Sequence, residues 1–478
     1  MINKMRRIHT VHFVGIGGSG MSGIAEVMLS LGYAVQGSDL KPNKQTKRLE
    51  NQGASVFIGH AADNIRDADA VVVSSAIDET NPEVSAAREQ LMPVVSRAEM
   101  LAELMRFRYS VVVAGTHGKT TTTSLVASLL AEGGLDPTFV IGGRLKSADA
   151  NARLGQGDYL VAEADESDAS FVHLKPMLAV VTNIDADHMS TYDGDIEKLK
   201  GSFIEFLHNL PFYGLAVVCT DDAGINDVLP DIGRSVTTYG TNEEADVRAI
   251  NVEFSEGRTE FDVVRTGDTM TASTNMHVTM HLPGMHNVRN ALAAIAVADE
   301  LQIGDDAVVN AFEKFEGIDR RFQRLGEVKT AAGTIMIVDD YGHHPTEIEV
   351  TLSAARSGWP ERRVVLVFQP HRYSRTRDLM DDFANVLSSA DVLVLLDVYA
   401  AGEEPIAGAD GRAMTRAIRT RGAVEPVFVE SLSDIEPVLR DLLEDGDLVL
   451  TMGAGDIGAY ATGLPELLSD GPQLRAHE

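Results

Sequence analysis

A lysine and a run of hydroxyl side chains follow a short glycine turn. Residues 111–123 read VVVAGTHGKTTTT, which predicts a buried strand, a turn and a helix that begins near the lysine. In such a turn backbone N–H groups cradle phosphate oxygens, the lysine reaches the β- and γ-phosphates, and the next hydroxyl ligates Mg²⁺. The segment is a shortened form of the phosphate-loop motif G-x-x-x-x-G-K-[ST], because Val113 stands where the first glycine of that motif would be. The predicted ATP contacts are Gly115, Thr116, His117, Gly118, Lys119, Thr120 and Thr121.

Acidic residues follow the next two apolar runs. Residues 163–168 read EADESD, and residues 182–188 read TNIDADH. The carboxyl ends of parallel strands meet at one edge of a sheet, and Mg²⁺ prefers oxygen ligands. We therefore predict Thr120, Glu163 and His188 as metal ligands, with a phosphate contact as the alternative for His188. The competing interpretation is a solvated acidic loop in an acidic protein.

A second glycine-rich segment lies near the N-terminus. Residues 15–20 read GIGGSG, follow an apolar run and precede a helical pattern, and Asp39 ends the next predicted strand. This arrangement suits a pyrophosphate at a helix N-terminus. Taken alone it leaves three interpretations open: a tight turn, an NAD(P) or FAD site of an oxidoreductase, or a site for another nucleotide diphosphate. The candidate binding residues are Gly17, Gly18, Ser19, Gly20 and Asp39.

Further polar groups lie in the second half of the chain. Asn287 and Asn290 are one helical turn apart and can read a base edge together, although Asn287 alone also suits a helix N-cap. The segments 339–347 (DDYGHHPTE) and 369–376 (QPHRYSRT) follow predicted strands. Because guanidinium groups match carboxylates and phosphates, these two loops predict an anion site.

The elements that must position these residues alternate between short apolar runs and helical patterns. This alternation predicts an α/β protein with mostly parallel sheets. Changes of pattern divide the chain into 1–107, 108–322 and 323–478, and the middle part includes a β-rich stretch around 245–282. The length of 478 residues agrees with more than one domain.

Composition excludes several classes of protein. The formal net charge of −30 opposes binding to nucleic acid or to an anionic membrane surface. One cysteine allows neither an intrachain disulfide nor a cysteine-based metal cluster. No apolar run resembles a signal peptide or a membrane span, so we expect a cytoplasmic protein.

Six segments taken together resemble the ATP-dependent Mur ligases of peptidoglycan synthesis. They read GTHGKTTTT, EADESD, TNIDADHMSTY, GMHNVRNALAA, DDYGHHPTEI and QPHRYSRT, and they occur in the family's order over nearly the whole chain. The resemblance implies three domains: an N-terminal Rossmann-like domain for a UDP-sugar, a central ATPase and a C-terminal Rossmann-like domain for an amino acid. The segment GIGGSGMSG narrows the resemblance to members that join L-alanine to the lactyl carboxylate of UDP-N-acetylmuramate, through an acyl phosphate and a tetrahedral intermediate.

The resemblance also implies roles for single residues. Gly17, Gly18, Ser19, Gly20 and Asp39 would hold the UDP-sugar. Asn287 and Asn290 would contact adenine, while Arg321 and Asp339 would approach the nucleotide from the other side. His344, Arg372 and Arg375 would position L-alanine and the reacting carboxylate, and His344 is a candidate base by its chemistry. Later-acting relatives often carry a carbamylated lysine; Lys198 and Lys200 lie too early for it.

ATP and Mg²⁺ are thus the expected cofactors, UDP-N-acetylmuramate and L-alanine the expected substrates, and a monomer or homodimer the expected state. Three other functions stay open as alternatives. They are a ligase that attaches a preformed peptide to the same sugar nucleotide, a nicotinamide-dependent oxidoreductase, and an ATP-binding switch without catalysis.

Overall fold

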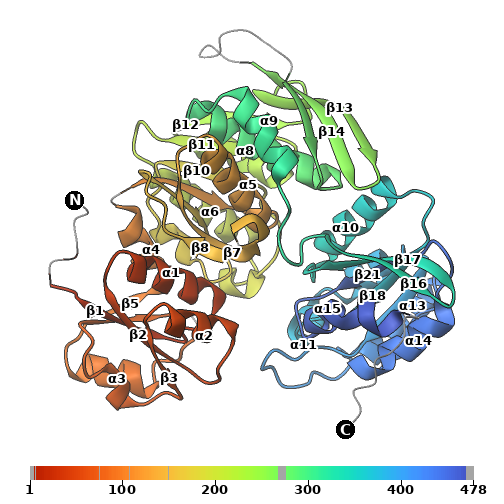
Figure 1. Ribbon diagram of the computed structural model, residues 1–478, viewed down its shortest axis with the longest axis horizontal. Coiled ribbons are helices and arrows are strands. Elements are labelled where there is room, and N and C mark those ends of the chain that lie inside the picture. Colours follow the sequence, from red (N-terminus) through yellow and green to blue (C-terminus); the bar gives the residue numbers. More distant parts are fainter. Residues whose placement is uncertain are drawn as a thin grey trace. The chain divides into compact units, whose positions relative to one another are not determined.

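The structure is a computed structural model that describes residues 5, 7–74, 76–106, 108–148, 150–266 and 276–469. It divides into two compact units (Figure 1). The first contains Met1–Val252, Phe261–Thr279 and Val288–Glu316, and the second contains Glu253–Glu260, Met280–Asn287 and Gly317–Glu478.

The first unit begins with a five-stranded parallel sheet in the order β3-β2-β1-β4-β5. Because its central strand reads TVHFV and has four buried residues, the sheet is covered on both faces. Its strands are β1 (Thr10–Val14), β2 (Ala34–Asp39), β3 (Ser55–Ile58), β4 (Ala70–Val73) and β5 (Val94–Ser96), and its helices are α1 (Ser19–Ser30), α2 (Lys44–Asn51), α3 (Pro82–Glu89) and α4 (Arg97–Met105).

A ten-stranded sheet follows, in the order β15-β14-β13-β12-β11-β10-β6-β9-β7-β8. Parallel pairs run from β7 to β13, whereas β8 pairs antiparallel with β7. Its strands are β6 (Tyr109–Ala114), β7 (Thr138–Leu145), β8 (Ala150–Arg153), β9 (Tyr159–Glu163), β10 (Leu178–Val181), β11 (Leu215–Cys219), β12 (Ser235–Gly240), β13 (Val247–Ser255), β14 (Arg258–Arg265) and β15 (Met276–Met280). The accompanying helices are α5 (Lys119–Glu132), α6 (Ile196–His208), α7 (Ala223–Val228), α8 (Met285–Glu300) and α9 (Asp305–Lys314).

Helix α5 is rich in threonine, which is a weak helix former. Two of its buried hydroxyls bond within the helix: Thr123 donates to the Lys119 carbonyl at 2.8 Å and Ser124 donates to the Thr120 carbonyl at 2.7 Å. These bonds satisfy polar groups that burial would otherwise leave without partners. The helix therefore depends on its position at the centre of the sheet rather than on propensity.

Helix α1 joins the two sheets of the first unit (Figure 1). It starts in the first glycine loop and packs on β7 and β8, where a Cβ on Gly23 would lie 3.2 Å from the Cβ of Ala152 and 3.3 Å from Val140. One hydrophobic core extends from Val11 in β1 to Val112 in β6 and onward. Since packing this close leaves little freedom, the first glycine loop holds a defined position relative to the second.

The second unit contains a six-stranded sheet in the order β16-β17-β21-β18-β19-β20, in which only the β16–β17 pair is antiparallel among the described pairs. The strands are β16 (Gln323–Thr330), β17 (Gly333–Asp340), β18 (Val364–Phe368), β19 (Val392–Leu396), β20 (Val427–Val429) and β21 (Leu448–Met452). The helices are α10 (Pro345–Gly358), α11 (Tyr373–Asp378), α12 (Met380–Leu387), α13 (Gly411–Arg421), α14 (Ile435–Leu442) and α15 (Ile457–Leu468).

The predicted fold class is confirmed: the chain is α/β with mostly parallel sheets and a β-rich stretch formed by β13, β14 and β15. Two regions of the sequence predictions, Phe107 at the first boundary and residues 267–275 of the β-rich stretch, lie outside the described residues. Among the described helices, none has the length and apolar character that crossing a bilayer requires.

Candidate functional site

The second glycine loop connects β6 to α5 and needs glycine at two positions. Gly115 has φ +129° and Gly118 has φ +80°, backbone conformations that residues with a Cβ rarely adopt. A Cβ on Gly115 would collide with the hydroxyl of Thr182, and one on Gly118 would lie 2.6 Å from Oδ1 of Asn290. The loop therefore packs against Thr182 and Asn290 with no room for a side chain at either position, and its backbone has the glycine-dependent conformation of a phosphate cradle.

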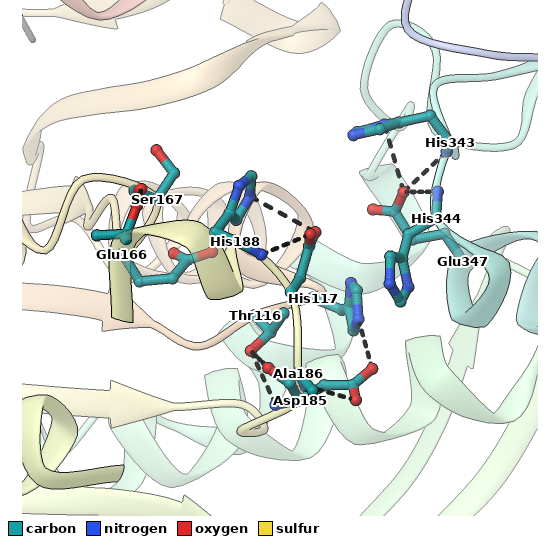
Figure 2. A network of polar contacts seen from close by, with 12 residues as sticks. Thr116, His117, Glu166, Ser167, Asp185, Ala186, His188, His343, His344 and Glu347 are labelled. Atoms are coloured by element: carbon teal, nitrogen blue, oxygen red, sulfur yellow. Dashed lines mark hydrogen bonds and ion pairs between the residues drawn. The ribbon is translucent and has the colours of Figure 1, made fainter. Parts of the chain in front are cut away.

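Residues that follow β10 hold this loop from the side (Figure 2). The Thr116 hydroxyl accepts the backbone N–H of Asp185 at 2.9 Å, and Nε2 of His117 lies 3.0 Å from Oδ2 of Asp185. The backbone N–H of His117 donates to Oδ1 of Asn183 at 2.8 Å, and Thr182 donates to the carbonyl of His117. Thr116 and His117 thus shape the loop through contacts with the protein itself.

The ammonium group of Lys119 lies inside the loop. Its Nζ donates to the carbonyls of Gly115 at 2.7 Å and Thr116 at 2.8 Å, and to Oε1 of Glu166 at 2.8 Å. Burial works to lower the pKa of Lys119, but the carboxylates of Glu166, Glu163 and Asp165 outweigh burial and raise it. The lysine therefore carries a full positive charge at the position where the sequence predicts the terminal phosphates.

Two of the three predicted metal ligands are in direct contact. The Thr120 hydroxyl donates to Oε1 of Glu163 at 2.8 Å, and Oε2 of Glu163 accepts the backbone N–H of Gly142 at 2.6 Å. A Cβ on Gly142 would lie 2.9 Å from both carboxylate oxygens, so this glycine admits the carboxylate. A hydroxyl and a carboxylate at this spacing are a donor set that suits Mg²⁺.

The third predicted ligand, His188, has φ +54°, and its Nε2 lies 3.5 Å from Oδ2 of Asp187. Its placement after β10 agrees with the predicted strand-end position. Lys198 pairs with Asp193, and Lys200 pairs with Glu197 and Asp227. Both lysines thus form ion pairs at the surface.

The carboxylate of Asp39 holds the first glycine loop. The backbone N–H of Gly17 donates to Oδ2 of Asp39 at 2.9 Å, and Nδ2 of Asn43 donates to the carbonyl of Gly17 at 3.2 Å. A Cβ on Gly17 would lie 2.7 Å from that Asp39 oxygen. Asp39, one of the candidate binding residues, therefore supports the loop in this structure. The side chain of Ser19 lies outside the described residues.

Both glycine loops line one cavity of about 360 Å³. Gly15, Gly18 and Gly20 of the first loop contribute to its wall, together with Lys119 of the second loop and Glu163 at the end of β9. A cavity of this volume is large enough for part of a substrate molecule. The structure thus places the candidate diphosphate loop and the candidate phosphate loop around a common space.

Arg97 is a cavity residue that the sequence reasoning missed. It is the first residue of α4, lines the cavity, and donates through Nη2 to Oδ2 of Asp165 at 2.8 Å. The partial burial of Asp165 works to raise its pKa, but Arg97, Ser167 and Lys119 outweigh it and lower the pKa. The available signal was weak, since Ser96 and Glu99 mark a helix start and nothing marks the arginine between them.

The two asparagines of α8 are both buried. Nδ2 of Asn287 donates to the carbonyl of Pro283 at 2.8 Å, and Oδ1 of Asn290 accepts from the Thr122 hydroxyl at 3.2 Å. Helix α8 begins at Met285, so Asn287 lies inside the helix, and the alternative of an N-cap is wrong. Asn290 lies beneath Gly118, which connects α8 to the phosphate loop.

In the second unit, His344 caps helix α10. Its Nδ1 accepts the backbone N–H of Thr346 at 3.4 Å, while Oε2 of Glu347 accepts the N–H groups of His343 at 2.9 Å and His344 at 3.2 Å (Figure 2). The contact to Nδ1 favours the tautomer with its proton on Nε2. A ring in that state donates a hydrogen bond to an anion rather than accepting a proton through Nε2.

Positive charge gathers after β18. Burial, together with the charges of His343, Arg375 and Arg372, lowers the pKa of His371 to about 4. Arg372 has φ +70° and starts helix α11, and the ring of His371 stacks on Tyr399 at 5.6 Å. This cluster of cations suits a carboxylate ligand. His371 was quoted in the sequence motif but was not among the predicted site residues.

Arg321 and Asp339 have different environments. Arg321 lies 5.3 Å from the ring centre of Tyr341 and 3.8 Å from Glu347. Asp339 is 2 % exposed, and its carboxylate contacts Arg320 at 2.9 Å and the Thr451 hydroxyl at 2.8 Å. Burial raises the pKa of Asp339 in spite of these partners. In this structure Asp339 connects the end of β17 to Arg320 and to Thr451 in β21.

Three family models match the chain in sequence. They are described as the Mur ligase family catalytic domain, over residues 10–109, the Mur ligase middle domain, over residues 113–298, and the Mur ligase glutamate ligase domain, over residues 320–455. Together these matches cover most of the chain in the order of the three predicted parts.

Solved structures show the same similarity. The UDP-N-acetylmuramate–alanine ligase of Thermotoga maritima is 30% identical with a TM-score of 0.79, and the match covers 96% of this chain and 98% of that one. A murein peptide ligase of Psychrobacter arcticus is 24% identical with a TM-score of 0.69, over 97% and 99% of the chains, and shows a shared fold. The UDP-N-acetylmuramate:L-alanyl-gamma-D-glutamyl-meso-diaminopimelate ligase of Neisseria meningitides is 29% identical with a TM-score of 0.59, over 66% and 100%.

Proposed function

Because the chain belongs to the Mur ligase family, we propose that it is an ATP-dependent ligase that joins L-alanine to the lactyl carboxylate of UDP-N-acetylmuramate. The observation that carries the proposal is the cavity between the two glycine loops, since Lys119 and Glu163 line it together with Gly15, Gly18 and Gly20. A ligase of this kind must bring a carboxylate on a sugar nucleotide to the terminal phosphate of ATP, and this cavity has a phosphate loop on one side and a diphosphate loop on the other.

The chemistry follows from what an amide bond requires. A carboxylate is a poor acyl donor because oxide would have to leave, so its oxygen first takes the γ-phosphoryl group of ATP to give an acyl phosphate. Phosphoryl transfer depends on positioning and on neutralising charge, which the Lys119 ammonium and the N–H groups of the loop supply. The neutral amine of L-alanine then attacks the acyl carbon, and the tetrahedral intermediate loses one proton from nitrogen to the solvent and breaks its C–O bond to release phosphate.

Thr120 and Glu163 would hold Mg²⁺, with His188 as a further ligand, and the ion would supply neutralising charge to the phosphates when bound. Gly115, Thr116, His117, Gly118 and Thr121 would enclose the phosphates, and Asn287, Asn290, Arg321 and Asp339 would bind the rest of the nucleotide. The first loop, with Gly17, Gly18, Ser19, Gly20 and Asp39, would hold the diphosphate of the sugar nucleotide.

The residues of the second unit would bind the amino acid. Arg372 and Arg375 belong to the cationic cluster after β18, and a carboxylate of L-alanine would neutralise it. His344 would donate a hydrogen bond from Nε2, because its Nδ1 accepts the backbone N–H of Thr346. The proposal thus gives the sugar nucleotide to the first unit and the amino acid to the second.

Amino-acid-dependent release of ADP tests the proposal. Release should require UDP-N-acetylmuramate, Mg²⁺ and L-alanine together. Release without the sugar nucleotide would indicate an ordinary ATPase, and nucleotide binding without turnover would indicate a switch. NAD(P)H binding in place of ATP binding would favour the oxidoreductase.

A second candidate is supported by the 29% identity to the Neisseria ligase, whose name includes a tripeptide. In that case the acceptor would be a preformed peptide that contains L-Ala-γ-D-Glu. The same assay separates the two candidates when L-alanine and this tripeptide are compared at equal concentration. Turnover only with the tripeptide would replace L-alanine as the proposed acceptor.

A further inference from the structure

The ammonium group of Lys119 has three N–H donors, and three acceptors surround it. Two are carbonyls of its own loop, at 2.7 and 2.8 Å, and the third is Oε1 of Glu166 at 2.8 Å. A phosphate that approaches this ammonium therefore competes with an existing partner. Glu166 is the partner that carries charge, and it comes from the segment after β9 rather than from the loop.

Glu166 is deeply buried, with an exposed fraction of 3 %, and its two oxygens differ. Oε1 accepts from Lys119, whereas Oε2 is buried with no hydrogen-bond partner among the described residues. A buried carboxylate oxygen without a donor is costly when it is charged. A proton on Oε2 would remove that cost and would leave Oε1 able to accept from Lys119.

Three ionisable groups face this carboxyl group. Lys119 belongs to α5, Asp165 is the preceding residue, and the Tyr192 hydroxyl donates to the backbone carbonyl of Glu166 at 2.5 Å. Burial raises the pKa of Glu166, Lys119 opposes this rise and Asp165 adds to it, and the net result is a pKa of about 7. The carboxyl group is thus close to half protonated at neutral pH before any ligand binds.

Binding of a nucleotide changes this balance in one direction. The terminal phosphates bring negative charge to the ammonium that now compensates Glu166, and like charges that share one cation disfavour each other's ionised state. We propose that Glu166 is a positioning residue, which holds Lys119 in the empty phosphate loop and takes up a proton on Oε2 when a nucleoside triphosphate binds. This inference rests on the proposed function, because it requires that the loop binds a nucleotide.

The direction of the pH dependence follows. Below about pH 6 the carboxyl group is already protonated, so binding takes up no proton there. The carboxyl group of Glu166 has a higher pKa when a nucleotide is bound than before it binds. At pH values between these two pKa values, binding takes up as much as one proton per site. Nucleotide affinity therefore falls as pH rises above about 7, with a slope of at most about tenfold per pH unit.

The test is calorimetric titration of the full chain with the β,γ-imido analogue of ATP and Mg²⁺, without sugar nucleotide, at pH 8. Comparing buffers of different ionisation heat gives the number of protons taken up. The wild-type chain should take up more protons than Glu166→Gln, by a difference between about half a proton and one. Protonation of the analogue itself cancels in this difference. Tyr192→Phe is the matched control, because it changes a neighbour of Glu166 and leaves the carboxyl group, so its proton uptake should equal that of the wild type.

Two outcomes overturn the inference. One is equal proton uptake by the wild type and by Glu166→Gln. The other needs no variant and so does not depend on its folding: a wild-type affinity for the fully ionised analogue, corrected for the analogue's own protonation, that stays constant from pH 6.5 to pH 8.5. A wild-type chain that binds no nucleotide at any pH would instead contradict the proposed function.

Discussion

The two glycine loops of the first unit have the same plan and different chemistry. Each leaves a buried strand and begins a helix, α1 in one case and α5 in the other. The second loop contains its own cation, Lys119, whereas the first offers backbone N–H groups and has Arg97 of α4 as a neighbouring cavity residue. The difference predicts a division of labour, in which the first loop holds an anion in place and the second supplies charge to a reacting phosphate.

The largest expected effect is on the cation of the second loop. Lys119→Ala should lower L-alanine-dependent ADP release by at least about a thousandfold, because a preorganised donor to a developing charge contributes on that scale. Binding of UDP-N-acetylmuramate to the first loop should remain within about twofold, since Lys119 makes its contacts with the second loop and Glu166. Steady-state kinetics and calorimetry measure the two effects separately.

Lys119→Arg is the control for charge alone. A guanidinium keeps the positive charge but does not fit the two carbonyl contacts of the ammonium, so activity should stay low. Full activity in Lys119→Ala would show that the second loop does not carry the reaction.

The second prediction compares one glycine substitution in each loop. Gly115 has φ +129°, and Gly115→Ala places a Cβ against Thr182. Because this substitution introduces a few kcal/mol of strain, it should weaken ATP binding by about a hundredfold. Gly17→Ala places a Cβ 2.7 Å from Oδ2 of Asp39 and should weaken binding of the sugar nucleotide instead. Titration of each variant with each ligand measures both affinities.

Gly304→Ala is the matched control, because Gly304 has φ −68° and no atom within 4 Å of the position of the added Cβ. It should bind both ligands as the wild type does. If Gly115→Ala and Gly17→Ala each weakened both ligands equally, the division of labour between the loops would be wrong.

The sequence predicted these loops because the backbone geometry demands particular residues. Gly115 and Gly118 have positive φ, and the pairing of Thr120 with Glu163 follows from two strand ends at one edge of a sheet. Arg97 could not be found in this way, since its position in the cavity depends on how α4 packs.

Tertiary packing also decides what the polar residues contact. Asn287 suited a helix N-cap in the sequence, but the helix begins two residues earlier and its side chain bonds to Pro283. Asp339 was predicted to open a loop after a strand, but β17 continues to Asp340, and the Asp339 carboxylate contacts Arg320 and Thr451. The partners of Asp339 lie 19 and 112 residues away in sequence, and local patterns carry no information about them.

The third prediction concerns Arg97, the cation that lines the cavity beside the first loop. Arg97→Ala should raise the KM for UDP-N-acetylmuramate by about tenfold, the scale of one charge-assisted hydrogen bond to an anion, and should leave ATP affinity unchanged. Arg97→Lys should recover part of the loss, because it restores the charge without the planar fork. A lower kcat with an unchanged KM would place Arg97 with the second loop instead.

The smallest expected effect is on the free energy of unfolding, and it concerns the residues that support each loop. Asp185 and Asn183 support the second loop close to solvent, whereas a fully buried carboxylate, Glu83, supports the first. The carbonyl of Ser38 accepts the N–H groups of Gly15 and Ile16, and the Ser38 hydroxyl donates to Glu83 at 2.5 Å. Besides its contact with Asp39, the first loop is thus connected through Ser38 to one buried charge.

Burial works to raise the pKa of Glu83, but contacts with His12, Ser38 and Asn64 outweigh it and bring the pKa from 4.5 to about 2. A carboxyl group whose pKa is lower in the folded chain stabilises the fold above pH 4.5, and this contribution disappears as pH falls towards 2. Glu83→Gln should therefore lower the free energy of unfolding by at most about 3 kcal/mol at neutral pH, and by progressively less in acid. Urea titrations of both proteins from pH 7 down to pH 3 measure this difference. A difference that stays constant over that range would mean that Glu83 stabilises the first loop by its shape alone, and the contrast between a charged support and a solvated one would not hold.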